Sequence, residues 1–181
     1  MGRVSEQRIG NRRIDRIRET AYVEGLDELD LDELRQRRDE CLAEREYLSL
    51  LRRLVQGRAE ILRAELDARG SGEERGPLID RLAQILSGDE RQSPARGEAV
   101  KVGVPEEELL LARRRVERLV TDAGISDPSA LDDANLASAV ELLATEEREV
   151  STARFDVIRV LDTLQDELKR RYREDPTLVL S

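Results

Sequence analysis

Two long segments of the chain carry an apolar residue at every seventh position. In the first segment these residues are Leu34, Cys41, Leu48, Val55 and Leu62. In the second segment they are Leu136, Leu143, Val150, Val157 and Leu164. A seven-residue period is typical of helices that pack along a narrow seam. The pattern therefore predicts one long helix over residues 29–69 and another over residues 132–173.

The segments between and around the two long helices are shorter or more polar. Residues 77–87 and 105–123 each have amphipathic spacing with a proline near the start, which predicts two accessory helices. Residues 88–104 are rich in Gly, Ser, Glu and Arg and are expected to form a flexible linker. Asp30 or Asp32 is suited to cap the start of the first long helix.

These elements divide the chain into three expected parts. Residues 1–28 are an Arg-rich N-terminal segment, expected to be frayed with at most a short helix. Residues 29–172 form the helical domain, and residues 174–181 form a short tail whose role is open. Charged residues make up 39% of the chain and aromatic residues only 2%. This composition suits long helices that pack along narrow seams and does not suit a thick core or a sheet.

The two long helices are an internal repeat. A shift of 102 positions places residues 29–69 on residues 131–171 without a gap. Among the residue types that recur are Leu29, Leu34, Glu44, Ser49, Arg52, Val55, Leu62, Glu65, Leu66 and Arg69. Two similar long helices on one chain are most simply an antiparallel pair that shares one seam. We therefore predict an all-α fold with a long antiparallel coiled-coil helix pair and shorter accessory helices.

Charged residues interrupt the middle of this seam, beside the seven-residue stripe. They are Arg38, Arg45 and Arg52 in the first helix and Glu147 and Arg154 in the second. Burial of an unpaired charge there would cost on the order of several kcal/mol. Two interpretations remain open. In one, Glu147 pairs with Arg45 or Arg52 across the seam and fixes its register. In the other, the arginines turn outward and bind an anionic ligand.

The remaining composition excludes several classes of function. The net charge of −9 argues against general binding of nucleic acid, so no direct DNA binding is expected. The chain has no histidine and one cysteine, Cys41, which is expected to be a buried structural thiol, so no metal site is predicted. There is no Gly-rich phosphate loop, and no catalytic residue is assigned. No membrane span is expected, and the lone cysteine favours a reducing cytoplasm.

Two groups of residues within the repeat carry a resemblance to a known family. They are Ser49-x2-Arg52-x3-Gln56-x3-Glu60 and Glu147-x3-Ser151-x2-Arg154-x7-Asp162. Both resemble the duplicated ExxxSxxRxxxQxxxD signature of the RsiG-type anti-sigma factors of actinobacteria. The chain departs from that signature at three positions. Arg45 stands in place of Glu, Glu60 in place of Asp, and Ile158 in place of Gln.

The resemblance implies a specific function. Proteins of that family bind a dimer of cyclic di-GMP on two antiparallel coiled-coil helices, and the loaded protein sequesters the sporulation sigma factor WhiG. The ligand-binding residues it implies here are Ser49, Arg52, Gln56, Glu60, Glu147, Ser151, Arg154 and Asp162, with Arg45 as a further candidate. A non-enzymatic cytoplasmic anti-sigma factor is thus the leading hypothesis. The alternatives are a structural or adaptor coiled coil, in which the arginines only set register, and a carboxylate-based enzyme.

Overall fold

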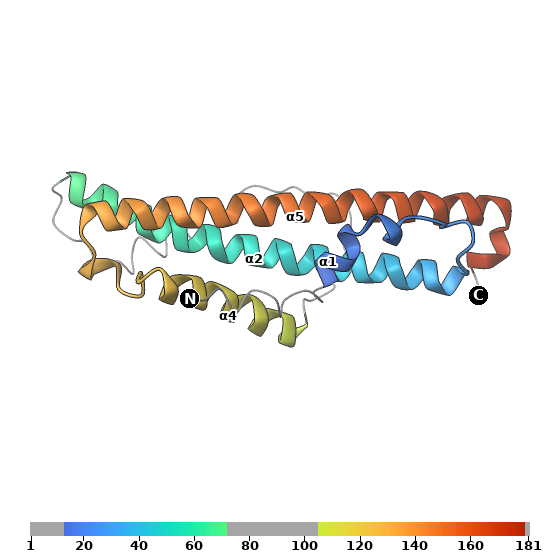
Figure 1. The fold of residues 1–181 in the computed structure, drawn as a ribbon, viewed down its shortest axis with the longest axis horizontal. Coiled ribbons are helices and arrows are strands. Elements are labelled where there is room, and N and C mark those ends of the chain that lie inside the picture. The colour runs from blue at the N-terminus through green and yellow to red at the C-terminus, as the bar shows by residue number, and fades with distance from the viewer. Residues whose placement is uncertain (1–12, 72–104, 180–181) are drawn as a thin grey trace, which may run out of the picture. The chain divides into compact units, whose positions relative to one another are not determined.

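The computed structural model describes residues 13–71 and 105–179, and every regular element within these ranges is helical. In chain order they are α1 (Arg13–Arg18), η2 (Thr20–Tyr22), α2 (Leu31–Ser71), α4 (Glu106–Asp122), η4 (Pro128–Ala130), α5 (Asp133–Glu174) and η5 (Pro176–Val179) (Figure 1). The predicted all-α fold, with a long helix pair and shorter helices beside it, is confirmed. The predicted helix over residues 77–87 and the linker over residues 88–104 lie outside the described residues. The division at residues 28 and 172 stays a prediction.

The chain forms two compact units. Unit 1 contains residues 1–52 and 148–181, and unit 2 contains residues 53–147. Both long helices contribute to both units, because α2 passes from unit 1 to unit 2 after Arg52 and α5 returns to unit 1 at Arg148. Each unit is therefore built on one segment of α2 and one segment of α5.

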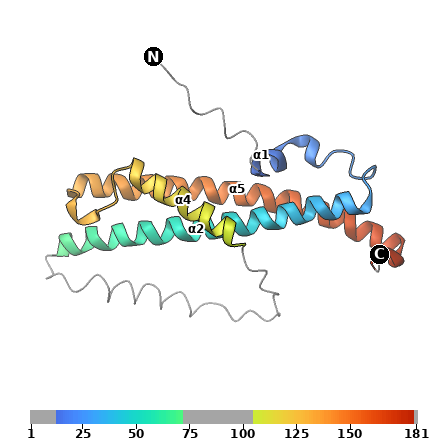
Figure 2. The ribbon, with the colours of Figure 1, turned by 90° about the horizontal axis from the view of Figure 1, so that it is seen from below.

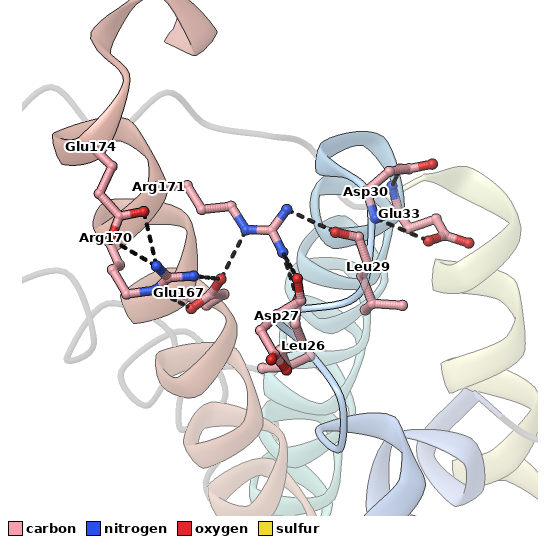
Figure 3. Close-up of polar contacts among 9 residues, drawn as sticks. All are labelled: Leu26, Asp27, Leu29, Asp30, Glu33, Glu167, Arg170, Arg171 and Glu174. Atoms are coloured by element: carbon pink, nitrogen blue, oxygen red, sulfur yellow. Dashed lines mark hydrogen bonds and ion pairs between the residues drawn. The ribbon is translucent and has the colours of Figure 1, made fainter.

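The start of α2 in unit 1 is fixed by a capping box. The Asp30 carboxylate accepts a hydrogen bond from the backbone N–H of Glu33 (2.7 Å), and the Glu33 carboxylate accepts one from the backbone N–H of Asp30 (3.2 Å). This reciprocal pair satisfies backbone N–H groups that a helix N-terminus leaves without partners. Asp30 is thus the predicted cap (Figure 3).

An arginine near the end of α5 holds the loop that precedes α2. The Arg171 guanidinium donates to the backbone carbonyls of Leu29 (2.8 Å) and Leu26 (2.7 Å), and its Nε donates to Glu167 (2.8 Å) (Figure 3). The side chain of Arg171 lies between its own helix and this loop. The contact joins the C-terminal end of α5 to the N-terminal end of α2, as an antiparallel pair requires.

The core of unit 1 lies between α2, α5 and the short helix α1. Its buried apolar side chains are Ile17, Leu34, Cys41, Leu48, Leu51, Val150, Ala153, Val157, Leu161, Leu164 and Leu168. Cys41 is fully buried, as predicted. Ile17 of α1 is 1% exposed, so residues 13–18 are a packed element. The short helix that was expected within the N-terminal segment is present.

In unit 2 the helix α4 lies alongside the segments of α2 and α5 (Figures 1 and 2). The buried apolar side chains of this unit are Val55, Ala59, Leu62, Ala112, Val116, Val120, Ile125, Leu136, Ala139 and Leu143. Arg115 of α4 forms an ion pair with Glu146 of α5 (2.8 Å). Arg69 of α2 donates to the carbonyl of Leu131 (2.6 Å) and pairs with Asp133 (3.1 Å). The last contact places the end of α2 beside the start of α5.

In each unit a third helix, α1 or α4, covers the residues on one side of the seven-residue stripe. We call each side of the stripe a flank. In unit 1, α1 binds Glu44 of α2 and Asp156 of α5 through Arg13 and Arg18. In unit 2, α4 binds α5 on the equivalent flank at Glu146. The charged mid-seam positions lie on the other flank and are half-buried at its edge. If α2 and α5 packed on each other without a third helix, these charged side chains would be more deeply buried.

Candidate ligand-binding site

The clearest polar contact between α2 and α5 in unit 1 joins two residues of the signature. The Nε–H of Arg154 donates a hydrogen bond to the Oγ atom of Ser49 (2.9 Å). The Ser49 hydroxyl in turn donates to the backbone carbonyl of Arg45, one turn earlier on α2 (2.7 Å). Both Ser49 and Arg154 are half-buried. The serine of one repeat therefore orients the arginine of the other.

The orientation leaves part of the Arg154 side chain available. Among residues 13–71 and 105–179, Ser49 is the only hydrogen-bond partner of this guanidinium, and no carboxylate pairs with it. A guanidinium has five N–H donors in a planar fork, and Ser49 uses one of them. The two terminal nitrogens of Arg154 can therefore bind a planar or tetrahedral acceptor in a bidentate manner.

The antiparallel register makes the signature of unit 1 nearly two-fold symmetric. Arg52 lies three residues after Ser49, and Ser151 lies three residues before Arg154. Because the helices run in opposite directions, the register set by Ser49 and Arg154 places Arg52 of α2 opposite Ser151 of α5. Both Arg52 and Ser151 are half-buried. We call these four residues, Ser49, Arg52, Ser151 and Arg154, the signature face of unit 1.

The signature face is turned away from α1. Five residues separate Glu44, which binds α1, from Ser49, and this spacing corresponds to about 140° around an α-helix. On α5, Asp156 binds α1 and lies two residues after Arg154, which corresponds to about 160°. The helix that closes the core of unit 1 thus leaves the signature face uncovered. A ligand could reach these side chains without displacing α1.

The remaining predicted residues are not among the four that define the signature face. Asp162, in unit 1, is exposed on α5. In unit 2, the Gln56 amide donates to the Glu147 carboxylate (3.2 Å), and Glu60 is exposed. Arg45 forms an ion pair with its neighbour Glu46 (2.7 Å). The interpretation in which Glu147 pairs with Arg45 or Arg52 across the seam stays a prediction.

A second polar cluster in unit 1 was not predicted from the sequence. Glu44 is 4% exposed, and its carboxylate pairs with Arg13 of α1 (2.7 Å). Nearby, the Tyr22 hydroxyl donates to Glu40 (3.1 Å), and burial raises the pKa of Tyr22 above its usual value. Burial also raises the pKa of the Cys41 thiol to about 11. The recurrence of Glu44 in the repeat was the only sequence signal for this cluster.

Within residues 13–71 and 105–179, no group of three or more His, Cys, Asp or Glu side chains is placed to hold a metal ion. No helix in these ranges is long and apolar enough to cross a membrane.

Comparison with known proteins supports the resemblance on which the site was predicted. Residues 20–86 match a family model described as RsiG-like. The match includes α2 and supports an RsiG-type protein. No curated protein matches the chain. The RsiG-like family is a regulatory, non-enzymatic family.

Proposed function

We propose that this RsiG-like chain is a cytoplasmic anti-sigma factor that binds a dimer of cyclic di-GMP on its two long helices. The loaded protein sequesters a sporulation sigma factor of the WhiG type and thereby blocks transcription. It performs no chemistry on the ligand. Binding and release of the nucleotide control the affinity for the sigma factor.

The observation that carries the proposal is the contact between Ser49 and Arg154. Because the hydrogen bond from Arg154 Nε to Ser49 spans the two helices, the guanidinium is held in place before any ligand arrives. Its terminal nitrogens have no carboxylate partner among the described residues. An oriented arginine without a counter-charge, on a chain of net charge −9, is suited to a phosphate or to guanine O6 and N7.

The symmetry of the signature face also suits this ligand. Cyclic di-GMP consists of two identical nucleotides joined in a ring, so its two halves offer the same groups in a two-fold arrangement. In unit 1, the hydrogen bond joins Ser49 to Arg154, and the register places Ser151 opposite Arg52, so the same two residue types recur in a two-fold arrangement. One arginine and one serine thus correspond to each half of a symmetric ligand.

The remaining signature residues take roles from the resemblance and from their chemistry. Glu60, Glu147 and Asp162 can accept hydrogen bonds from guanine N1–H and the exocyclic amine, and Gln56 can both donate and accept. Arg45, the further candidate, stands where the signature has Glu and pairs with Glu46. Because of this difference, we expect the two repeats to contribute unequally to binding.

The ligand acts on the sigma factor through a shift in population. A bound dimer of cyclic di-GMP carries four phosphate charges, which the arginines of α2 and α5 compensate. If the ligand favours one arrangement of the helices and the sigma factor prefers that arrangement, each raises the affinity for the other by the same factor. Basic promoter-binding surfaces of the sigma factor would be attracted to this acidic chain.

Calorimetric titration with cyclic di-GMP, with and without the sigma factor, tests the proposal. We expect heat of binding, and we expect Arg52→Ala with Arg154→Ala to abolish ligand-dependent capture of the sigma factor. The control removes two exposed arginines from α4, Arg113→Ala with Arg114→Ala, and changes the net charge equally. Absence of heat in both titrations would end the proposal, and equal capture by both variants would show that the residues are wrong.

The alternative, a structural or adaptor coiled coil, predicts a different result. In that case the bond between Arg154 and Ser49 serves only to set the register of the helices. Arg154→Leu would then raise the melting temperature, because an apolar side chain would replace a half-buried charge. No nucleotide would change the melting temperature of the wild type. A melting curve with and without cyclic di-GMP therefore separates the two functions.

A further inference from the structure

Phe155 is the most exposed large apolar residue among the described residues. It is the only phenylalanine in the chain, and 61% of its surface is accessible to solvent. Two of the tyrosines of unit 1, by contrast, are held by polar contacts: Tyr22 bonds to Glu40, and Tyr172 receives a hydrogen bond from Arg35. A single exposed apolar side chain is common on protein surfaces. A role for Phe155 therefore depends on its position on α5 relative to the signature residues.

Phe155 lies on the same side of α5 as the signature residues of unit 1. It follows Ser151 by four residues and precedes Ile158 by three, and residues at these spacings are neighbours on a helix surface. Asp162 follows Phe155 by seven residues, which is two helical turns or about 10 Å along the axis. The ring is thus at the margin of the signature face, with a predicted phosphate or ribose contact on one side and a predicted guanine contact on the other.

The charges around Phe155 favour an anionic aromatic ligand. Arg154 precedes it, and Arg159, which is exposed, lies one turn after it. The acidic neighbour Asp156 is compensated by Arg18 of α1 (2.8 Å). An aromatic ring among arginines is the combination with which proteins bind nucleotides, because the ring stacks on a base and the cations bind phosphate. The chain as a whole has a net charge of −9, whereas Phe155 has two arginines close to it in the sequence.

We propose that Phe155 is a further ligand-binding residue whose ring stacks on a guanine base of bound cyclic di-GMP. The inference rests on the proposed function and adds a contact that the signature does not contain. The repeat carries Arg53 at the matching position, so the aromatic contact belongs to the second repeat alone. Ile158, where the signature has Gln, places an apolar side chain beside the ring and extends the surface on which a base can rest.

Substitution of Phe155 tests the contact through ligand affinity. Stacking of one base on an aromatic side chain corresponds to about a 5- to 150-fold effect on affinity. We expect Phe155→Ala to weaken binding of cyclic di-GMP by a factor in this range and Phe155→Tyr to bind within a few-fold of the wild type. Leu142→Ala removes another exposed apolar side chain of α5, 40% accessible, and should leave affinity unchanged. Because Phe155 is exposed, all variants should melt near the wild type.

Fluorescence gives a second readout that a structural role would not change. The chain has no tryptophan, so Phe155→Trp introduces a single tryptophan at the proposed contact, whose emission is recorded apart from that of the three tyrosines. Stacking on guanine should quench its emission when cyclic di-GMP is added. Leu142→Trp, on the same helix, should show no such quenching.

The outcomes separate this inference from the proposed function. If the wild type binds cyclic di-GMP and Phe155→Ala binds equally well, the inference is wrong and the proposed function stands. If Phe155→Ala keeps its ligand affinity and captures less sigma factor at saturating ligand, the ring contacts the protein partner, and the inference is again wrong. If the wild type does not bind cyclic di-GMP, the proposed function fails and the inference fails with it.

Discussion

The ion pair between Arg13 and Glu44 allows a quantitative test of how α1 is held in unit 1. The Glu44 side chain is 6% exposed and the Arg13 side chain 25% exposed, and the two charged groups are 2.7 Å apart. Removal of one partner from a fully buried pair costs about 3–5 kcal/mol, because the other charge stays buried and unpaired. Since Arg13 is partly open to water, we expect Arg13→Ala to lower the free energy of unfolding by about 1–3 kcal/mol.

The assay is thermal or urea unfolding followed by circular dichroism. For a chain of this size, each kcal/mol shifts the melting temperature by about 2–4 °C. The double variant Arg13→Ala with Glu44→Leu should recover at least half of the loss, since it leaves no buried charge without a partner.

Arg16→Ala is the matched control on the same short helix. Arg16 pairs with Glu40 at 3.5 Å, and its side chain is 52% exposed. An exposed pair of this kind contributes about 0–1 kcal/mol, so this variant should be close to the wild type. If Arg13→Ala were no less stable than Arg16→Ala, or if the double variant showed no recovery, the argument from burial would be refuted.

Three further predictions concern the long helices. Ser49→Ala and Arg154→Ala should each lower the free energy of unfolding by about 1 kcal/mol, and the double variant should lose little more, which a double-mutant cycle in urea measures. Gly57→Ala should raise the free energy of unfolding by about 0.5–1 kcal/mol, because Gly57 lies within α2 and an added Cβ meets nothing within 4 Å; a decrease would show that its surroundings are tighter than described. Arg170 and then Arg171 lower the pKa of Glu167 from 4.5 to about 2. The stabilising effect of this carboxylate is therefore present above pH 4.5 and lost as the pH falls toward 2, so wild type and Glu167→Gln should differ at neutral pH and converge in acid unfolding experiments.

Much of the fold was predictable because it is encoded locally. The seven-residue period predicted α2 over residues 29–69 and α5 over residues 132–173, and the structure has them at Leu31–Ser71 and Asp133–Glu174. Asp30 or Asp32 was predicted as the cap because Asp is favoured at a helix N-cap, and the structure has Asp30 in that role. The burial of Cys41 followed from its place on the stripe.

The candidate site was predicted in part. Ser49 and Arg154 were selected as single residues, and the structure shows that they bond to each other. This pairing depends on the register of two helices that are 105 residues apart in the chain at this point. The ion pair of Arg45 with its neighbour Glu46 was not predicted, because the sequence does not specify the rotamer of Arg45. Phe155 was not selected, since a lone aromatic residue has no periodic pattern.

The sequence by itself determined that the chain forms two long, similar helices with a narrow apolar stripe and a duplicated polar group. Only the tertiary structure decided which flank of that stripe is buried and which faces outward. The physical reason is that the stripe is a property of each helix alone, whereas the covered flank depends on contacts with α1 in unit 1 and with α4 in unit 2. Arg13 pairs with Glu44 and Arg115 with Glu146 on one flank. Arg154 is therefore left on the other flank, where Ser49 holds it with its terminal nitrogens available to a ligand.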